Sequence, residues 1–191
     1  MTNRSVLLRC RNILPEAAKK GMAVDSKLER LQREVAAAST MSADEMDSHP
    51  PGKWCAAEVL EHLYLTYTGT IKGFERLLAA ERPMVKPANW KQRAGFFLVV
   101  GFRHMPSGRE APSTTRPRGL PREKVIAEIA QKIADMDTAI RRCEEKHGAN
   151  VKLLDHPILG ALTGEQWRKF HLVHGRHHLK QIWRLRRDPA G

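Results

Sequence analysis

The sequence predicts an all-α protein, a four-helix bundle with a long crossover between its second and third helices. Four segments carry apolar residues at the spacing of an amphipathic helix, and no segment shows the alternation typical of a strand. A proline-rich stretch separates the second of these segments from the third. Four helices with one long link are typical of a crossover bundle.

The first element follows an N-terminal extension. Residues 1–21 show no sustained period, so we expect them to be poorly ordered and to precede a single domain over residues 22–187. The first helix should begin at Asp25 or Ser26, because either side chain can accept a hydrogen bond from the first turn. Its apolar positions at helical spacing are Leu28, Leu31 and Val35.

The second helix is expected from about Trp54 to Ala80. A short capped turn, "MSADEM", and a break at His49–Lys53 separate it from the first. Residues Arg82–Pro121 then form the long crossover, with one short apolar helix at Lys91–His104.

The third and fourth helices follow the crossover. The third should begin near Pro121, because proline is favoured in the first turn, and end at about Lys146. The fourth should begin at a capping box formed by Thr163 and Gln166 and continue to about Arg187. Short connections favour antiparallel neighbours for helices one and two and for helices three and four.

Composition excludes several classes of protein. The chain has 191 residues, and its longest apolar stretch, Ala94–Phe102, is too short to cross a bilayer, so we expect no membrane partner. Cys10, Cys55 and Cys143 form no CxxC pair, which argues against a disulfide framework and favours a reducing cytoplasm. No secretory signal is expected at the N-terminus.

The net charge of +12 is concentrated in the crossover. Residues 83–122 carry eight basic side chains and one acidic side chain. Such a segment could contact nucleic acid, and this basic binding module is the alternative function. A solvated basic loop is the preferred interpretation, because the segment lacks the interleaved aromatic residues of a nucleic-acid platform.

The last helix gathers histidines in "FHLVHGRHHLKQIW", residues 170–183. His174 and His178 lie one turn apart on the same face, where two imidazoles can bind a single ion. His171 lies near the same stripe, and His177 points away from it. A third ligand must come from another helix.

The second helix offers His62 on a stripe that includes Thr66, Gly69 and Gly73. If this stripe faced inward, its small residues would leave space beside the histidine for water or substrate. The competing interpretation is that the glycines allow close helix packing and that His62 is a satisfied core residue.

These residues carry a resemblance to a known family. The segments W54-x3-E58-x3-H62 and H174-x3-H178-x2-Q181 resemble the two signature segments of the DinB-like (DinB/YfiT) superfamily, and residues 156–182 are similar to an uncharacterised branch of it. The resemblance implies a four-helix bundle, often homodimeric. It also implies a divalent ion such as nickel or zinc, with ligands at His62, His174 and His178.

Such a site would activate a nucleophile. Three neutral imidazoles leave the ion its double charge, so a bound water or low-molecular-weight thiol would ionise more readily. Glu58, one turn before His62, is predicted to orient an imidazole or act as a base, or else to face solvent, and His171 is the spare ligand. The function expected is therefore a metal-dependent enzyme acting with a small thiol or water. A bundle that keeps only a structural metal is the further alternative.

Overall fold

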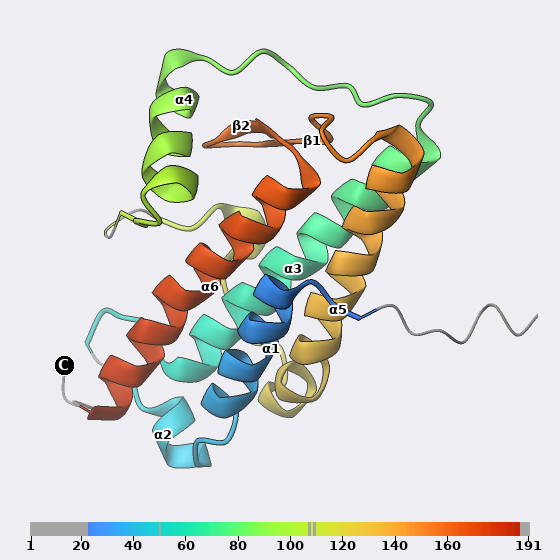
Figure 1. Cartoon of the computed structure of the whole chain (residues 1–191). Helices are drawn as coiled ribbons and strands as arrows, with labels where there is room; N and C mark the ends of the chain where they lie inside the picture. Colours follow the sequence, from blue (N-terminus) through green and yellow to red (C-terminus); the bar gives the residue numbers. More distant parts are fainter. Residues whose placement is uncertain (1–22, 50, 107, 109, 188–191) are drawn as a thin grey trace, which may run out of the picture.

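The computed structural model describes residues 23–49, 51–106, 108 and 110–187, and this part of the chain is mostly helical (Figure 1). The α-helices are α1 (Ser26–Ala38), α2 (Ala43–Asp47), α3 (Ala56–Ala79), α4 (Trp90–Phe96), α5 (Arg122–His147) and α6 (Gly164–Arg187). The other elements are a π-helix, η2 (Phe97–Gly101), a 3-10 helix, η3 (Ser113–Thr115), and the strands β1 (Leu154–His156) and β2 (Gly160–Leu162). The expected extension over residues 1–21 lies outside the described residues.

The four long helices, α1, α3, α5 and α6, share one apolar core. Each contributes the residues that recur at its helical period, as Leu31 does from α1, Tyr67 from α3, Ile133 from α5 and Ile182 from α6, all fully buried. The apolar face expected for the first helix is confirmed, because Leu28, Leu31 and Val35 are all inside.

Helices α3 and α5 lie side by side and run in the same direction (Figure 1). Toward their N-terminal ends, the Tyr64 hydroxyl donates to the Glu128 carboxylate at 2.6 Å. Toward their C-terminal ends, Lys146 Nζ donates to the Leu78 carbonyl at 2.8 Å. A chain that leaves α3 must return along its whole length before starting a parallel neighbour. The long crossover therefore has a topological reason.

The neighbours of α1 differ from the expectation. Helix α1 packs mainly against α5 and α6, and α3 also packs against α5 and α6. The expected pairing of the first two long helices as neighbours is wrong, because α2 and the loop after it carry the chain across the end of the core (Figure 1). The antiparallel pairing of α5 with α6 is confirmed by Arg168, near the start of α6, which donates to Glu144, near the end of α5.

The helix starts follow the predicted capping chemistry. The Asp25 side chain accepts a hydrogen bond from the Lys27 amide at 2.9 Å and caps α1. Thr163 and Gln166 form the expected capping box, in which the Thr163 amide donates to Gln166 Oε1 at 3.0 Å and the Gln166 amide donates to Thr163 Oγ1 at 3.3 Å. Local side chains therefore set these helix starts.

A small antiparallel hairpin of β1 and β2 corrects the expectation that the chain has no strand. Leu154 pairs with Leu162 and His156 with Gly160. Gly160 has φ 73°, a conformation that favours glycine, and the ring nitrogen His156 Nδ1 accepts from the Ile158 amide at 3.1 Å. Strands of three residues are too short to show a period in sequence.

The crossover contains the expected short apolar helix, which is α4 continued by η2. Its buried residues are Val99 and Val100, whereas Trp90 and Phe97 are exposed. None of the helices within the described ranges is both long enough and apolar enough to span a membrane.

A buried ion cluster joins three of the long helices. Arg168 of α6 donates from Nε to Asp137 at 2.7 Å and from both terminal nitrogens to the two Glu144 oxygens at 2.8 Å. Asp137 is fully buried and also accepts from the Asp25 amide at 2.9 Å and from Arg141. The cluster therefore ties the start of α1 to α5 and α6.

Candidate metal centre

Three imidazole nitrogens converge between α3 and α6. His174 Nε2 lies 3.3 Å from His62 Nε2 and 3.1 Å from His178 Nε2. All three ligand atoms lie within 4.8 Å of one another. The structure therefore brings together the three histidines that the sequence selected, from two helices that are far apart in the chain.

These separations fit the ligand set of a single ion. With metal–nitrogen distances of about 2.0–2.1 Å, two ligand nitrogens lie about 2.9 Å apart at a right angle and about 3.4 Å apart at the tetrahedral angle. The separations of 3.1 and 3.3 Å lie between these two values. The group contains histidines alone, with no carboxylate or thiol. The residues present thus fit a divalent transition ion with imidazole ligands.

The crossover orients His62. Its Nδ1–H donates to the Thr115 carbonyl of η3 at 2.8 Å, and because a carbonyl only accepts, this bond leaves the Nε2 lone pair facing the other histidines. The crossover is in turn held by Glu61, whose buried carboxylate accepts from the Arg118 amide at 2.9 Å and the Gly119 amide at 3.2 Å. Glu61 therefore helps to position the Thr115 carbonyl.

Gln181 orients His178 from within α6. His178 Nδ1–H donates to Gln181 Oε1 at 2.8 Å, and this again leaves the Nε2 lone pair directed at the cluster. The Gln181 amide nitrogen lies 3.2 Å from His177 Nε2 and donates to it. One glutamine side chain therefore supports a predicted ligand and connects it to the partly exposed His177.

His174 lies between the other two predicted ligands. Its ring stacks on Phe170, with a centroid distance of 5.3 Å and an interplanar angle of 20°. Its Nδ1 is buried without a hydrogen-bond partner among the described residues. One hydrogen on His174 Nε2 could serve only one of the two lone pairs that face it, whereas a cation can serve all three nitrogens.

Burial keeps these imidazoles neutral. It lowers the pKa of His178 to about 3, with the charge of His62 as the second cause. Burial likewise lowers the pKa of His174 well below its usual value, and it lowers that of His62 despite the opposing bond to Thr115. Neutral imidazole is the form that binds a metal. The three nitrogens are therefore available as ligands at neutral pH.

Glu58 does not orient any of the three imidazoles. Its carboxylate accepts from the Cys55 amide at 2.9 Å, so it completes the N-terminal turn of α3, and it lies 3.6 Å from His49 Nδ1. Thr115 and Gln181, rather than Glu58, accept the Nδ1 hydrogen bonds of His62 and His178, and the alternative role of Glu58 as a base stays a prediction. With His49 and Cys55, Glu58 belongs to a separate group of possible ligands.

His171, the spare ligand, lies apart from the three-histidine group. It is fully buried, stacks on Trp167 at a centroid distance of 5.6 Å and meets the Tyr67 ring edge-on at 5.6 Å. Neither of its ring nitrogens has a hydrogen-bond partner in the described part of the chain. His171 therefore packs among aromatic side chains of the core.

The small residues of α3 do not line the site as expected. Gly73 packs against Leu154 of β1, which lies 2.7 Å from the position that a Cβ atom would occupy. Gly69 is exposed and faces open space. Close packing therefore explains Gly73, and the accessible side of the centre must lie elsewhere. Among the three predicted ligands, His62 is buried, whereas His174 and His178 keep part of their surface accessible.

Two supporting residues had little signal in the sequence. Glu61 is a charged residue in an otherwise apolar stretch of α3, "VLEHLYL", which marks it as unusual without naming its partner. Thr115 acts through its backbone carbonyl, so its side chain carries no information about the role. The fold alone shows both contacts.

Comparison with known proteins gives a family without an activity. Residues 22–184 match the sequence model of a family described as "Protein of unknown function (DUF1569)", and the chain belongs to this family. No curated protein and no solved structure matches the chain. The function must therefore be argued from the site.

Proposed function

We propose that this chain, as a member of the DUF1569 family, is a metal-dependent enzyme that binds one divalent transition ion through His62, His174 and His178. Nickel and zinc are the ions that we expect. The observation that carries the proposal is the convergence of three Nε2 atoms, two of which have their lone pairs directed inward by hydrogen bonds at Nδ1. A histidine that serves only to fill the core has no reason to direct its free nitrogen at two other histidines.

The proposed substrate is a small nucleophile, either a low-molecular-weight thiol or water. An ion held by three neutral imidazoles keeps its double charge, which favours ionisation of a thiol or water that reaches it. Within the chain, the hydrogen bonds to the Thr115 carbonyl and to Gln181 Oε1 keep the ring protons of His62 and His178 on Nδ1. These bonds also fix the ring orientations before any substrate arrives.

Access to the centre is the step that separates an enzyme from a structural metal site. Three nitrogens fill three of the four positions of tetrahedral zinc, or three of six around octahedral nickel. Glu58, one turn before His62, would be a candidate carboxylate to close the shell, but its hydrogen bond to the Cys55 amide engages it elsewhere. The partial exposure of His178 and of its neighbours His177 and Gln181 supports an approach to the ion from this part of α6.

The proposal extends to fold family, assembly and location. Four long helices around one core, a long link between α3 and α5, and ligands on α3 and α6 all support a four-helix bundle of the DinB/YfiT type. From the same resemblance we propose a homodimer, which light scattering tests as twice the chain mass. Within the described residues Cys55 and Cys143 are free thiols that form no disulfide with each other, which supports a reducing cytoplasm.

Cobalt substitution tests the enzyme proposal. The cobalt-loaded protein should show visible absorption bands that shift when azide or a small thiol is added, because an accessible position allows these ligands to reach the ion. His147→Ala is the matched control, since it removes a histidine at the end of α5 that lies outside the three-histidine group. This variant should behave like the unmodified protein.

If the metal is only structural, azide and thiols should leave the cobalt spectrum unchanged. If no small ligand alters the cobalt spectrum and Glu58→Gln alone does, the coordination shell is closed. The catalytic proposal would then be abandoned in favour of a metal that stabilises the fold. If cobalt does not bind at all, both versions fail together.

A further inference from the structure

A groove of about 690 Å³ lies along α6, between α1 and the loop that follows η2. Apolar side chains of Met105, Leu172 and Val173 form part of its lining, and the charged residues that line it are all basic. A volume in the range of about 300–1,000 Å³, with an apolar surface and a few convergent polar groups, is typical of a small-molecule site.

Some of the basic residues in the groove are already neutralised from outside it. Lys27 pairs with Glu165 at 2.9 Å, and the Arg176 guanidinium donates to Glu34 at 2.9 Å. Arg30 shares Glu34, and Arg33 pairs with Glu29 on the same helix. These carboxylates do not line the groove. The three carboxylates engage four of the eight basic residues that line the groove and leave the other four without an ion-pair partner.

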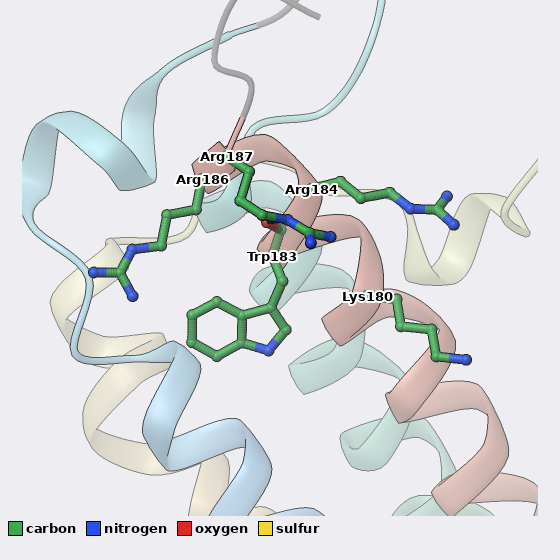
Figure 2. A pocket seen from close by; sticks show the side chains of 5 residues that line it. All are labelled: Lys180, Trp183, Arg184, Arg186 and Arg187. Carbon is green, nitrogen blue, oxygen red and sulfur yellow. Dashed lines mark hydrogen bonds between the residues drawn. The ribbon is translucent and has the colours of Figure 1, made fainter.

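Four further cations have no ion pair and no side-chain hydrogen bond within the described ranges. They are Arg103, Lys169, Lys180 and Arg184. Figure 2 shows Lys180 and Arg184 extending to the same side of α6, whereas Arg186 points the other way, where it donates to Glu45 at 2.9 Å. The helix dipole favours cations in the last turn of α6, but it does not explain Lys169 near the start of that helix or Arg103 from another segment.

Arg103 reaches the groove through an unusual backbone. Its φ is 57°, and it is the one residue other than glycine with a positive φ in the described part of the chain. The turn around it is held by hydrogen bonds from the Phe102 amide to Phe97 and from the His104 amide to Leu98, at 2.8 and 3.1 Å. Such a conformation is strained for a residue with a side chain and persists only where surrounding contacts impose it.

The groove adjoins the histidine centre through one side chain. Gln181 and His177 both line the groove, and Gln181 Oε1 accepts the Nδ1–H of His178. A molecule in the groove would therefore contact Gln181, whose side chain is hydrogen-bonded to the predicted ligand His178. Neither the helix dipole nor the core packing explains why unpaired cations from α6 and from the loop after η2 line the same groove.

We propose that this groove binds a small anionic molecule that carries at least two negative charges, as phosphate or carboxylate groups. Lys180 and Arg184, which lie one turn apart on α6, hold the charged groups, and the apolar residues of the groove pack against the remainder of the molecule. That this anion is part of the substrate rests on the proposed function. The binding itself depends only on the groove, because none of the groove cations belongs to the histidine group.

Calorimetric titration of inorganic pyrophosphate into metal-free full-length protein tests the binding. The double variant Lys180→Ala/Arg184→Ala should weaken it at least 10-fold. The control is Lys72→Ala/Arg76→Ala, which removes an exposed Lys/Arg pair of the same spacing from α3. The control should bind within 2-fold of the unmodified protein, because it changes the net charge equally but leaves the groove intact.

The outcomes separate this inference from the proposed enzyme. The variant at the groove should keep its full metal content, so loss of pyrophosphate binding is independent of the histidine centre. Equal weakening in both double variants, or no binding by the unmodified protein, overturns the inference. A single-stranded oligonucleotide that pyrophosphate cannot displace, and whose binding falls steeply with salt, also overturns it in favour of a polymeric ligand.

Discussion

Helix α6 carries two buried polar clusters, and they are completed in opposite ways. Around Arg168, each guanidinium donor meets a carboxylate oxygen of Asp137 or Glu144. Around His174, three neutral imidazoles direct nitrogens of the same kind at one another. In the Arg168 cluster, the charges and hydrogen bonds are balanced by groups of the chain itself. In the histidine cluster, three nitrogen acceptors face one another with too few hydrogen-bond donors between them.

The difference separates a structural role from a binding role. A buried charge is stable only when it is paired and hydrogen-bonded, and Arg168 meets both conditions within the chain. A set of converging lone pairs is completed by a cation from outside. We therefore expect mutations in the Arg168 cluster to affect folding and mutations in the histidine cluster to affect metal binding.

The largest expected effect is on the Arg168 cluster. Arg168→Met should lower the free energy of unfolding by about 3–5 kcal/mol, because it leaves the buried Asp137 and the partly buried Glu144 without their main partner. Urea unfolding measures this loss. Arg141→Met, which removes a more exposed partner of Asp137, is the control and should cost about 1 kcal/mol or less. Similar values for the two variants would contradict a structural role for the buried cluster.

The next effect is on metal affinity. Gln181→Ala removes the acceptor that orients His178, so the metal dissociation constant should rise about 10- to 100-fold while the stability of the metal-free protein changes little. Competition with a chromophoric chelator measures the constant. Gln131→Ala, which changes an exposed glutamine on α5, serves as the control. If both variants bind metal equally well, Gln181 has no supporting role.

The third effect is a change in pH dependence, which is small over any one pH unit. Burial lowers the pKa of His171 to about 3, with the charge of His156 as a further cause. Below about pH 6.5, His171 therefore binds a proton in the unfolded chain but not in the folded chain. The free energy of unfolding falls as pH drops from 6.5 toward 3. His171→Leu should reduce this slope by about 1.4 kcal/mol per pH unit near pH 4.5.

Urea unfolding of the metal-free protein at a series of pH values measures the slope. Replacement of the exposed His49 by leucine is the control for removal of a histidine as such. An unchanged slope in His171→Leu would show that His171 takes up its proton equally in both states.

The elements that the sequence predicted well are those with local causes. Asp25 and the Thr163–Gln166 pair act on amides of their own first turn, so the starts of α1 and α6 could be predicted. His174 and His178 lie on one helix, where spacing alone places them together. His62 joined them through the resemblance as well as through its position on α3.

The features that could not be predicted depend on contacts between distant segments. Thr115 serves His62 through a backbone carbonyl delivered by the crossover, and Glu61 holds that segment through two amides. Glu58 was favoured because it precedes His62 by one helical turn. Glu58 is also the third residue of α3, a position from which a glutamate accepts from the N-cap amide, and that local role takes its carboxylate.

Metal content tests the central claim most directly. Full-length protein purified without chelators should contain about one divalent transition ion per chain by elemental analysis, because three imidazoles form one site. His174→Ala/His178→Ala should contain almost none and should keep the circular dichroism of a helical protein. His147→Ala, which removes a histidine outside the three-histidine group, should retain the full content. Equal metal content in the double variant and the unmodified protein would contradict the account, since the ion would then be held elsewhere.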